Sequence, residues 1–155
     1  MNACPVVHTL HPGDLALATQ GEQMDTLLGS CVAIVLTDPR RTVGVMCHIV
    51  HSGPASSAAA RKTAHANAAL AGMYRLLHNK AIAPRLCEAY VYGGGNMFPY
   101  LLPSSSVGDD NARWVFEALA ADGIPVLAYG VGGAVYRRLR WTVGPEAPQV
   151  TEVPV

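Results

Sequence analysis

The feature that most constrains this sequence is a pair of apolar, β-rich segments joined by a short turn. Residues 31–36 read Cys-Val-Ala-Ile-Val-Leu, a composition typical of a strand buried on both faces. Asp38 and Pro39 follow, and proline favours a turn there because it presets φ for the second turn position. Residues 42–50 then predict a returning strand, so the whole segment predicts a β-hairpin.

The register of this hairpin decides which side chains meet across it. A four-residue loop after Thr37 pairs Thr37 with Thr42. Cys31 then lies opposite His48, and directly opposed Cβ atoms are about 5 Å apart, so the thiol and the imidazole can meet. A slip of one residue in either direction would replace His48 by a neighbour and bring different chemistry together.

A cysteine beside a histidine is the pairing that thiol catalysis requires. The thiolate is the nucleophile, and the imidazole can hold a proton and later donate it to a leaving group. Gly29 and Ser30 precede Cys31 in a bend whose backbone N–H groups can face a developing oxyanion. From the residues alone, an inert buried cysteine beside a strand histidine fits the same pattern.

Composition limits the class of protein. The chain has 155 residues, of which 50% are hydrophobic and 14% charged, values that predict one compact domain over residues 1–155 rather than disorder. Lys plus Arg and Asp plus Glu are 11 each, so the formal net charge is zero. A neutral chain argues against binding of a polyanion such as nucleic acid.

The four cysteines are few and scattered, so we expect reduced thiols rather than a disulfide framework. We find no pattern of a signal peptide and no apolar stretch of about 20 residues, and we expect a cytoplasmic protein. Cys47 and His48 are adjacent on a strand and point to opposite faces, so they cannot jointly bind a metal. We therefore expect no metal and no cofactor, with Cys4, Cys47 and Cys87 as terminal or packing thiols.

The remaining pattern mixes helices and strands without strict alternation, which favours an α+β sandwich over a doubly wound sheet.

Arg137 shares the apolar face of its strand, so we expect it to pair with a buried carboxylate or carbonyl, whereas Arg138 and Arg140 share the solvent face. The other predicted elements are one strand within residues 1–25, with residues 1–12 irregular, a helix over 56–79, a strand over 86–92, a helix from Asp109 or Asp110 to Gly123, strands over 124–131 and 135–143, and an edge strand near Val150.

Several short motifs along the chain occur together in one known family. Residues 26–32 read Thr-Leu-Leu-Gly-Ser-Cys-Val, and a histidine follows the cysteine after seventeen positions. Further motifs are Asp38-Pro39, Tyr-Gly-Gly at 92–94, Val-Gly-Asp-Asp-Asn at 107–111, and Gly132-Gly133 before Arg137. From about residue 26 to its end, the sequence resembles the CheD family of bacterial chemoreceptor glutamine deamidases.

The resemblance implies a fold and a role for each matched residue. The implied fold is a two-sheet β-sandwich flanked by helices in α/β/β/α layers, like that of the cytotoxic necrotizing factor toxins. Cys31 would be the nucleophile, His48 the acid and base, and Thr26 the polar residue that orients the imidazole. We expect the oxyanion site and substrate rim to be formed by four small residues: Gly29, Ser30, Gly93 and Gly94.

The implied function is a protein-glutamine deamidase that acts on methyl-accepting chemoreceptors through a thioester. A CheC-type phosphatase is a further expected partner. The chain departs from the family pattern at His51, over residues 62–65 and at Tyr136, where recognition of substrate or partner would lie. These departures leave two alternatives, a non-catalytic adaptor that binds receptors or such a phosphatase, and a thiol hydrolase that acts on another amide.

Overall fold

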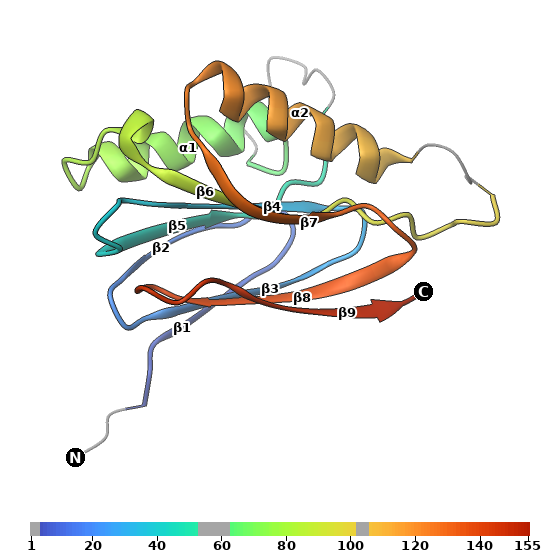
Figure 1. Ribbon diagram of the computed structural model, residues 1–155, viewed down its shortest axis with the longest axis horizontal. Coiled ribbons are helices and arrows are strands. Elements are labelled where there is room, and N and C mark those ends of the chain that lie inside the picture. The colour runs from blue at the N-terminus through green and yellow to red at the C-terminus, as the bar shows by residue number, and fades with distance from the viewer. Residues whose placement is uncertain (1–3, 53–62, 102–105) are drawn as a thin grey trace.

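The computed structural model describes residues 4–52, 63–101 and 106–155 (Figure 1). Within these residues, strands form a four-stranded sheet in the order β1-β3-β8-β9 and a five-stranded sheet in the order β2-β5-β4-β6-β7. The elements are β1 Val7–Leu10, β2 Leu15–Thr19, β3 Gln23–Leu28, β4 Val32–Thr37, β5 Val43–Cys47, α1 Ala66–His78, the 3₁₀ turn η2 Pro84–Leu86, β6 Glu88–Gly93, α2 Val107–Ala121, β7 Val126–Val131, β8 Val135–Thr142 and β9 Gln149–Pro154.

The two sheets pack face to face as a sandwich, which confirms the predicted α+β class (Figure 1). Burial along β8 alternates, so every second side chain enters the space between the sheets. Both described helices pack on the outer face of the five-stranded sheet. The described layers are therefore α/β/β, which corrects the predicted α/β/β/α order, and no described helix covers the outer face of the four-stranded sheet.

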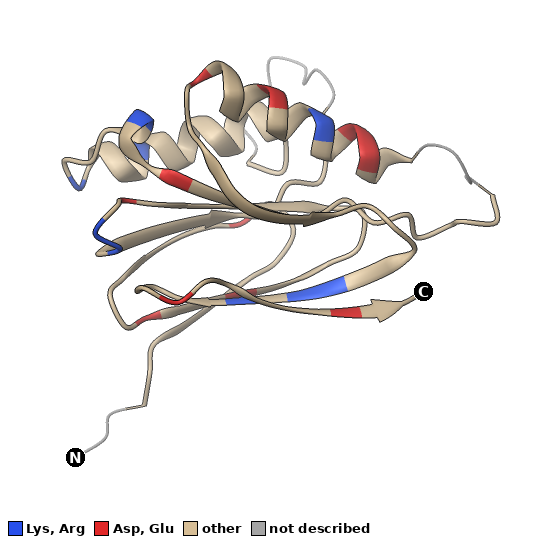
Figure 2. Ribbon diagram, viewed as in Figure 1, with Lys and Arg blue, Asp and Glu red and all other residues tan. Residues whose placement is uncertain are grey.

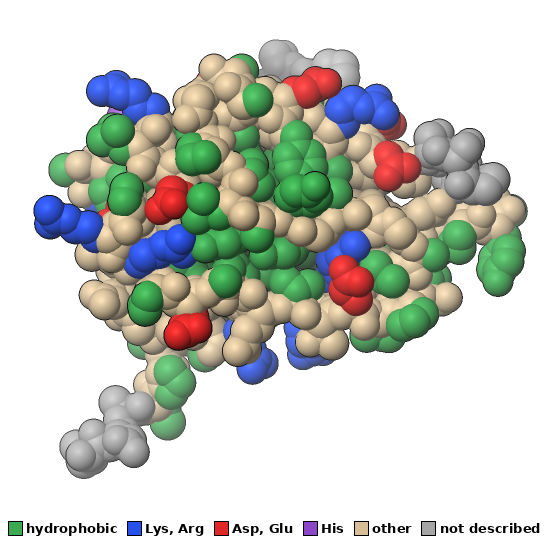
Figure 3. Space-filling view, viewed as in Figure 1, with side chains coloured by type: hydrophobic (Ala, Val, Ile, Leu, Met, Phe, Trp, Pro, Cys, Tyr) green, Lys and Arg blue, Asp and Glu red, His purple; other side chains and the backbone are tan. Residues whose placement is uncertain are grey.

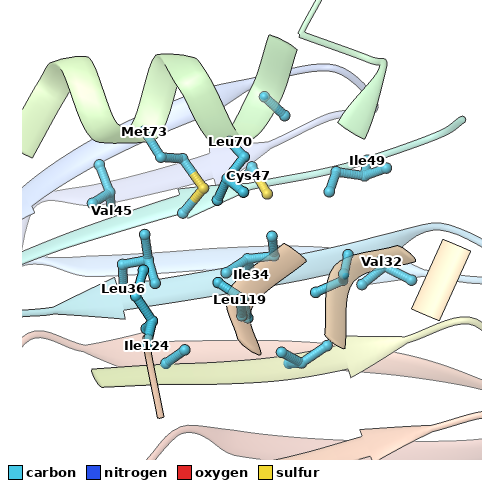
Figure 4. Close-up of a cluster of buried hydrophobic side chains, with 14 of the residues drawn as sticks. Val32, Ile34, Leu36, Val45, Cys47, Ile49, Leu70, Met73, Leu119 and Ile124 are labelled. Carbon is cyan, nitrogen blue, oxygen red and sulfur yellow. The ribbon is translucent and has the colours of Figure 1, made fainter. Parts of the chain in front are cut away.

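The core between the helices and the five-stranded sheet explains why Cys47 plays no part in a site with His48. Leu70 and Met73 of α1 and Leu119 of α2 meet the apolar side chains of β4 and β5 there (Figure 4). Cys47 points into this core, where burial raises the pKa of its thiol to about 12. This orientation confirms that Cys47 is a packing thiol.

The hairpin of β4 and β5 is present, but its register differs from the predicted one by two residues. Thr37 pairs with Gly44 rather than with Thr42. The carboxylate of Asp38 explains the difference, because it accepts hydrogen bonds from the backbone N–H groups of Thr42 and Val43 at 2.9 Å each. Those two N–H groups are consequently not available to pair with β4.

A shift of two residues preserves the face that each side chain occupies. Val32, the first residue of β4, forms a bridge with Ile49, two residues beyond the end of β5, with N–H···O distances of 3.0 and 2.8 Å. His48 therefore lies opposite Ala33, diagonal to Cys31 and on the same face of the sheet. The predicted direct opposition of Cys31 and His48 is wrong, and a diagonal pairing replaces it.

Other element boundaries also differ from the predicted ones. Residues 1–25 contain β1, β2 and the start of β3 instead of one strand. The first helix begins at Ala66 instead of residue 56, and residues 56–62 of that prediction lie outside the described residues. Ser106 rather than an aspartate caps α2, because its hydroxyl accepts a hydrogen bond from the N–H of Asp109. The end of α2 before Gly123 and the edge strand near Val150 are confirmed.

Charged residues of both signs are spread along the ribbon in both sheets and both helices (Figure 2). On the face shown in Figure 3, Lys and Arg alternate with Asp and Glu among larger apolar areas. None of the helices in the described residues is long and apolar enough to cross a membrane.

Candidate active site

A cleft of about 630 Å³ opens where the chain passes from one sheet to the other. β3 ends at Leu28 in the four-stranded sheet and β4 begins at Val32 in the five-stranded sheet. The bend between them exposes one side of Cys31, which shares the cleft with His48. The cleft is lined by Pro12, Leu27, Gly29, Ser30, Cys31, His48, Met97, Tyr136 and Arg138.

Thr26 holds the imidazole of His48 from within the sandwich. Its side chain is buried on β3, and its Oγ1 lies 2.7 Å from Nδ1 of His48. The same hydroxyl donates its single proton to the backbone oxygen of Leu10 at 2.8 Å. Nδ1–H of His48 must therefore donate to Thr26 Oγ1, which leaves Nε2 of the neutral ring as a proton acceptor.

Burial keeps both reacting groups neutral at neutral pH. It raises the pKa of the Cys31 thiol above its ordinary value of 9.0. It also lowers the pKa of His48 below 6.5, although the charge of Asp14 opposes this and that of His11 adds to it. The cleft thus holds a neutral thiol and a neutral imidazole whose Nε2 can accept a proton.

Gly93 and Gly94, at the end of β6, pack against the backbone oxygen of Cys31. The N–H of Gly94 donates to the oxygen of Cys31 at 2.8 Å. Gly93 has φ of +118°, and a Cβ at this position would collide with the same oxygen, so only glycine fits. Of the four predicted rim residues, the structure brings Gly29 and Ser30 to the cleft, while Gly93 and Gly94 lie outside its lining.

Asn111 links helix α2 to the segments that carry Cys31 and His48, a contact that the sequence did not indicate. Its buried side-chain amide donates to the backbone oxygens of Ser30 at 3.3 Å and Val50 at 3.1 Å. Ser30 directly precedes Cys31, and Val50 lies two residues after His48. The available signal was its place at the end of the Val-Gly-Asp-Asp-Asn motif at 107–111, which marks the residue but does not show what its side chain contacts.

Comparison with known proteins assigns the family. Residues 51–147 match the CheD family model, described as "CheD chemotactic sensory transduction". This chain belongs to the CheD family. The matched residues include Gly93, Gly94 and helix α2, which contact the backbone of Ser30 and Cys31 at the cleft.

Curated CheD relatives extend the similarity across Cys31 and His48. A protein of Albidiferax ferrireducens, named "Probable chemoreceptor glutamine deamidase CheD 2", is 34% identical over 90% of this chain and 83% of its own length. Proteins of Bordetella petrii and Pseudomonas fluorescens, both named "Probable chemoreceptor glutamine deamidase CheD", are 37% and 32% identical over 88% and 84% of this chain, and 61% and 75% of their own lengths. A solved structure of a Neisseria meningitidis protein of family model DUF152 aligns with 84% of this chain and 65% of its own at 14% identity, with a TM-score of 0.45.

Two of the departures from the CheD pattern have different places in the structure. Tyr136 lines the cleft beside Arg138. His51 lies outside the cleft lining and pairs with His65, with ring centroids 5.1 Å apart.

Among the described residues, no group of three or more His, Cys, Asp or Glu side chains is arranged to hold a metal ion.

Proposed function

We propose that this CheD chain is a protein-glutamine deamidase that converts chemoreceptor glutamines to glutamates, with Cys31 as nucleophile. The observation that carries the proposal is the shared cleft of Cys31 and His48, in which Thr26 fixes the imidazole with Nε2 as the basic nitrogen. The names of the relatives support the substrate class. A CheC-type phosphatase stays a predicted partner.

The first half of the reaction forms a thioester and releases ammonia. Nε2 of His48 takes the proton of the Cys31 thiol while sulfur attacks the carboxamide carbon of the glutamine. The carbonyl oxygen becomes an oxyanion, which backbone N–H groups of the bend at Gly29 and Ser30 stabilise. The imidazolium then gives its proton to the amide nitrogen, the C–N bond breaks and ammonia leaves.

The second half consumes one water molecule. Nε2 of His48 removes a proton from water as its oxygen attacks the thioester carbon. The C–S bond breaks, and the sulfur of Cys31 recovers its proton from the imidazolium. Glutamate is released, and the sum is glutamine plus water giving glutamate plus ammonia.

The proposal is tested by incubating the full chain with the cytoplasmic fragment of a methyl-accepting chemoreceptor. We expect each converted glutamine to gain about 1 Da and to release one ammonia, because NH₂ is replaced by OH. Mass spectrometry of receptor peptides and an ammonia assay measure the two products. Receptor peptides of unchanged mass, together with retention of the receptor on the immobilised chain, would contradict catalysis and favour the adaptor.

Thr26→Val should lower kcat of this reaction about 100-fold, because valine keeps the shape of threonine but accepts no hydrogen bond from Nδ1–H. The buried N–H then lacks a partner, and the ring loses its preferred orientation and tautomer. Nitrogen NMR of His48 measures the tautomer directly, and steady-state kinetics measure kcat.

Thr26→Ser is the matched control, since it keeps the hydroxyl between His48 and the Leu10 oxygen. We expect it to retain most of the activity and the Nδ1–H tautomer. Equal losses in the serine and valine variants would show that packing, rather than the hydrogen bond, accounts for the effect.

A further inference from the structure

The catalytic cleft contains one permanently charged side chain, that of Arg138, among its described lining residues. The other lining side chains are apolar, small or phenolic, apart from the thiol of Cys31 and the imidazole of His48. The proposed substrate group is a carboxamide, which is neutral. The charge of Arg138 is therefore not required to hold the carboxamide itself.

Arg138 lies at the solvent side of the cleft. On β8 it pairs with Leu27 of β3 and Thr151 of β9, on the outer face of the four-stranded sheet. No described helix covers this face, and Figure 2 shows basic residues along β8. Arg138 is exposed, and in the described part of the chain no carboxylate oxygen lies within 4 Å of its guanidinium.

A second, smaller cavity adjoins Arg138. It has a volume of about 200 Å³ and is lined by Thr9, Asp25, Thr26, Leu27 and Arg138. Arg138 and Leu27 thus line both cavities, so Arg138 lies where the cleft of Cys31 adjoins the exposed face of the four-stranded sheet.

We propose that Arg138 is a specificity-determining residue that pairs with a carboxylate of the substrate close to the reacting glutamine. The inference rests on the proposed function and names the substrate class more narrowly, as glutamines with an acidic neighbour. A guanidinium suits this task because its planar N–H groups match a carboxylate in two parallel hydrogen bonds. Pairing at the rim of a cleft acts mainly on substrate binding and on its salt dependence.

The test uses two receptor fragments that differ only at one position beside a converted glutamine, which is glutamate in one fragment and glutamine in the other. With Arg138→Gln, we expect KM for the glutamate-flanked fragment to rise about three- to fivefold, the upper part of the range of an exposed ion pair, with kcat unchanged. KM for the glutamine-flanked fragment should not change. Raising the salt concentration should reduce the preference of the unsubstituted chain.

Arg140→Gln is the matched control. Arg140 lies two residues further along β8 on the same exposed face, and it lines a different cavity with Thr142 and Glu146. We expect it to leave both KM values unchanged. A charge exchange completes the test, because Arg138→Glu should prefer a fragment in which lysine replaces the flanking glutamate.

Three outcomes would overturn the inference. Equal effects of Arg138→Gln on the two fragments would show that the guanidinium does not read the flanking charge. A rise in kcat would show that it retains the glutamate product instead. Conversion of neither fragment by the unsubstituted chain would overturn the proposed function as well, which separates that failure from a failure of Arg138 alone.

Discussion

Cys31→Ala is expected to reduce kcat for glutamine deamidation at least about 10⁴-fold, since no other described group in the cleft can form the thioester. His48 and the bend remain, but without the sulfur they act only on water. Mass spectrometry of receptor peptides after long incubation measures the residual rate. The fold should persist, because the side chain is only partly buried and the change removes one atom.

The other three thiols provide controls for this substitution. Cys4 is exposed, so Cys4→Ala should leave the rate unchanged.

Iodoacetamide should modify Cys31 slowly at neutral pH and faster as the pH rises past 9, because burial raises the pKa of its thiol. Cys47 and Cys87, whose pKa values are raised to about 12 and about 11, should stay unmodified in the native protein. Deamidation by Cys31→Ala at the original rate would refute the nucleophile.

The sequence correctly predicted that Cys31 and His48 share a face of the sheet, although the predicted hairpin register was wrong by two residues. Side chains on a strand alternate with a period of two, so a shift of two residues leaves faces unchanged. The shift itself depends on the carboxylate of Asp38, which captures two backbone N–H groups of the return strand. Turn preferences alone identify Asp38 as a turn residue but do not show which N–H groups its side chain will bind.

The support of the site depends on contacts between distant segments, which local patterns do not contain. Thr26 binds the oxygen of Leu10, which ends a four-residue edge strand too short for a clear alternation. Asn111 reaches Ser30 across 81 positions of sequence. The passage of the chain from one sheet to the other at residues 29–31 likewise follows from packing of the whole sandwich, since nothing in the bend specifies the sheet that its strands join.

Arg137 is a predicted inward-facing residue, and the structure confirms its pairing with a buried carbonyl, that of Gly93, whereas its carboxylate partner Glu152 is half exposed. Its guanidinium donates to Glu152 at 3.1 Å, to the oxygen of Gly93 at 3.0 Å and to that of Gly132 at 2.8 Å. Arg137 belongs to the four-stranded sheet, whereas Gly93 ends β6 of the other sheet. Arg137 is 3% exposed, so its bond to Gly93 links the two sheets inside the molecule, while Glu152 at the other end of the side chain is half exposed.

Arg137→Met is expected to lower the free energy of unfolding by about 3 kcal/mol, because methionine fills similar space but removes a donor from the buried carbonyl of Gly93 and from the partly buried carbonyl of Gly132, and so removes the link between the sheets. Urea denaturation followed by circular dichroism measures the change. Arg140→Met, on the exposed face of the same strand, should change stability by less than about 0.5 kcal/mol. Equal stability of the two variants would show that the buried guanidinium contributes no more than an exposed one. A loss of stability in Arg137→Met alone would indicate that the bond from Arg137 to Gly93 also helps to hold Gly93 against the backbone of Cys31.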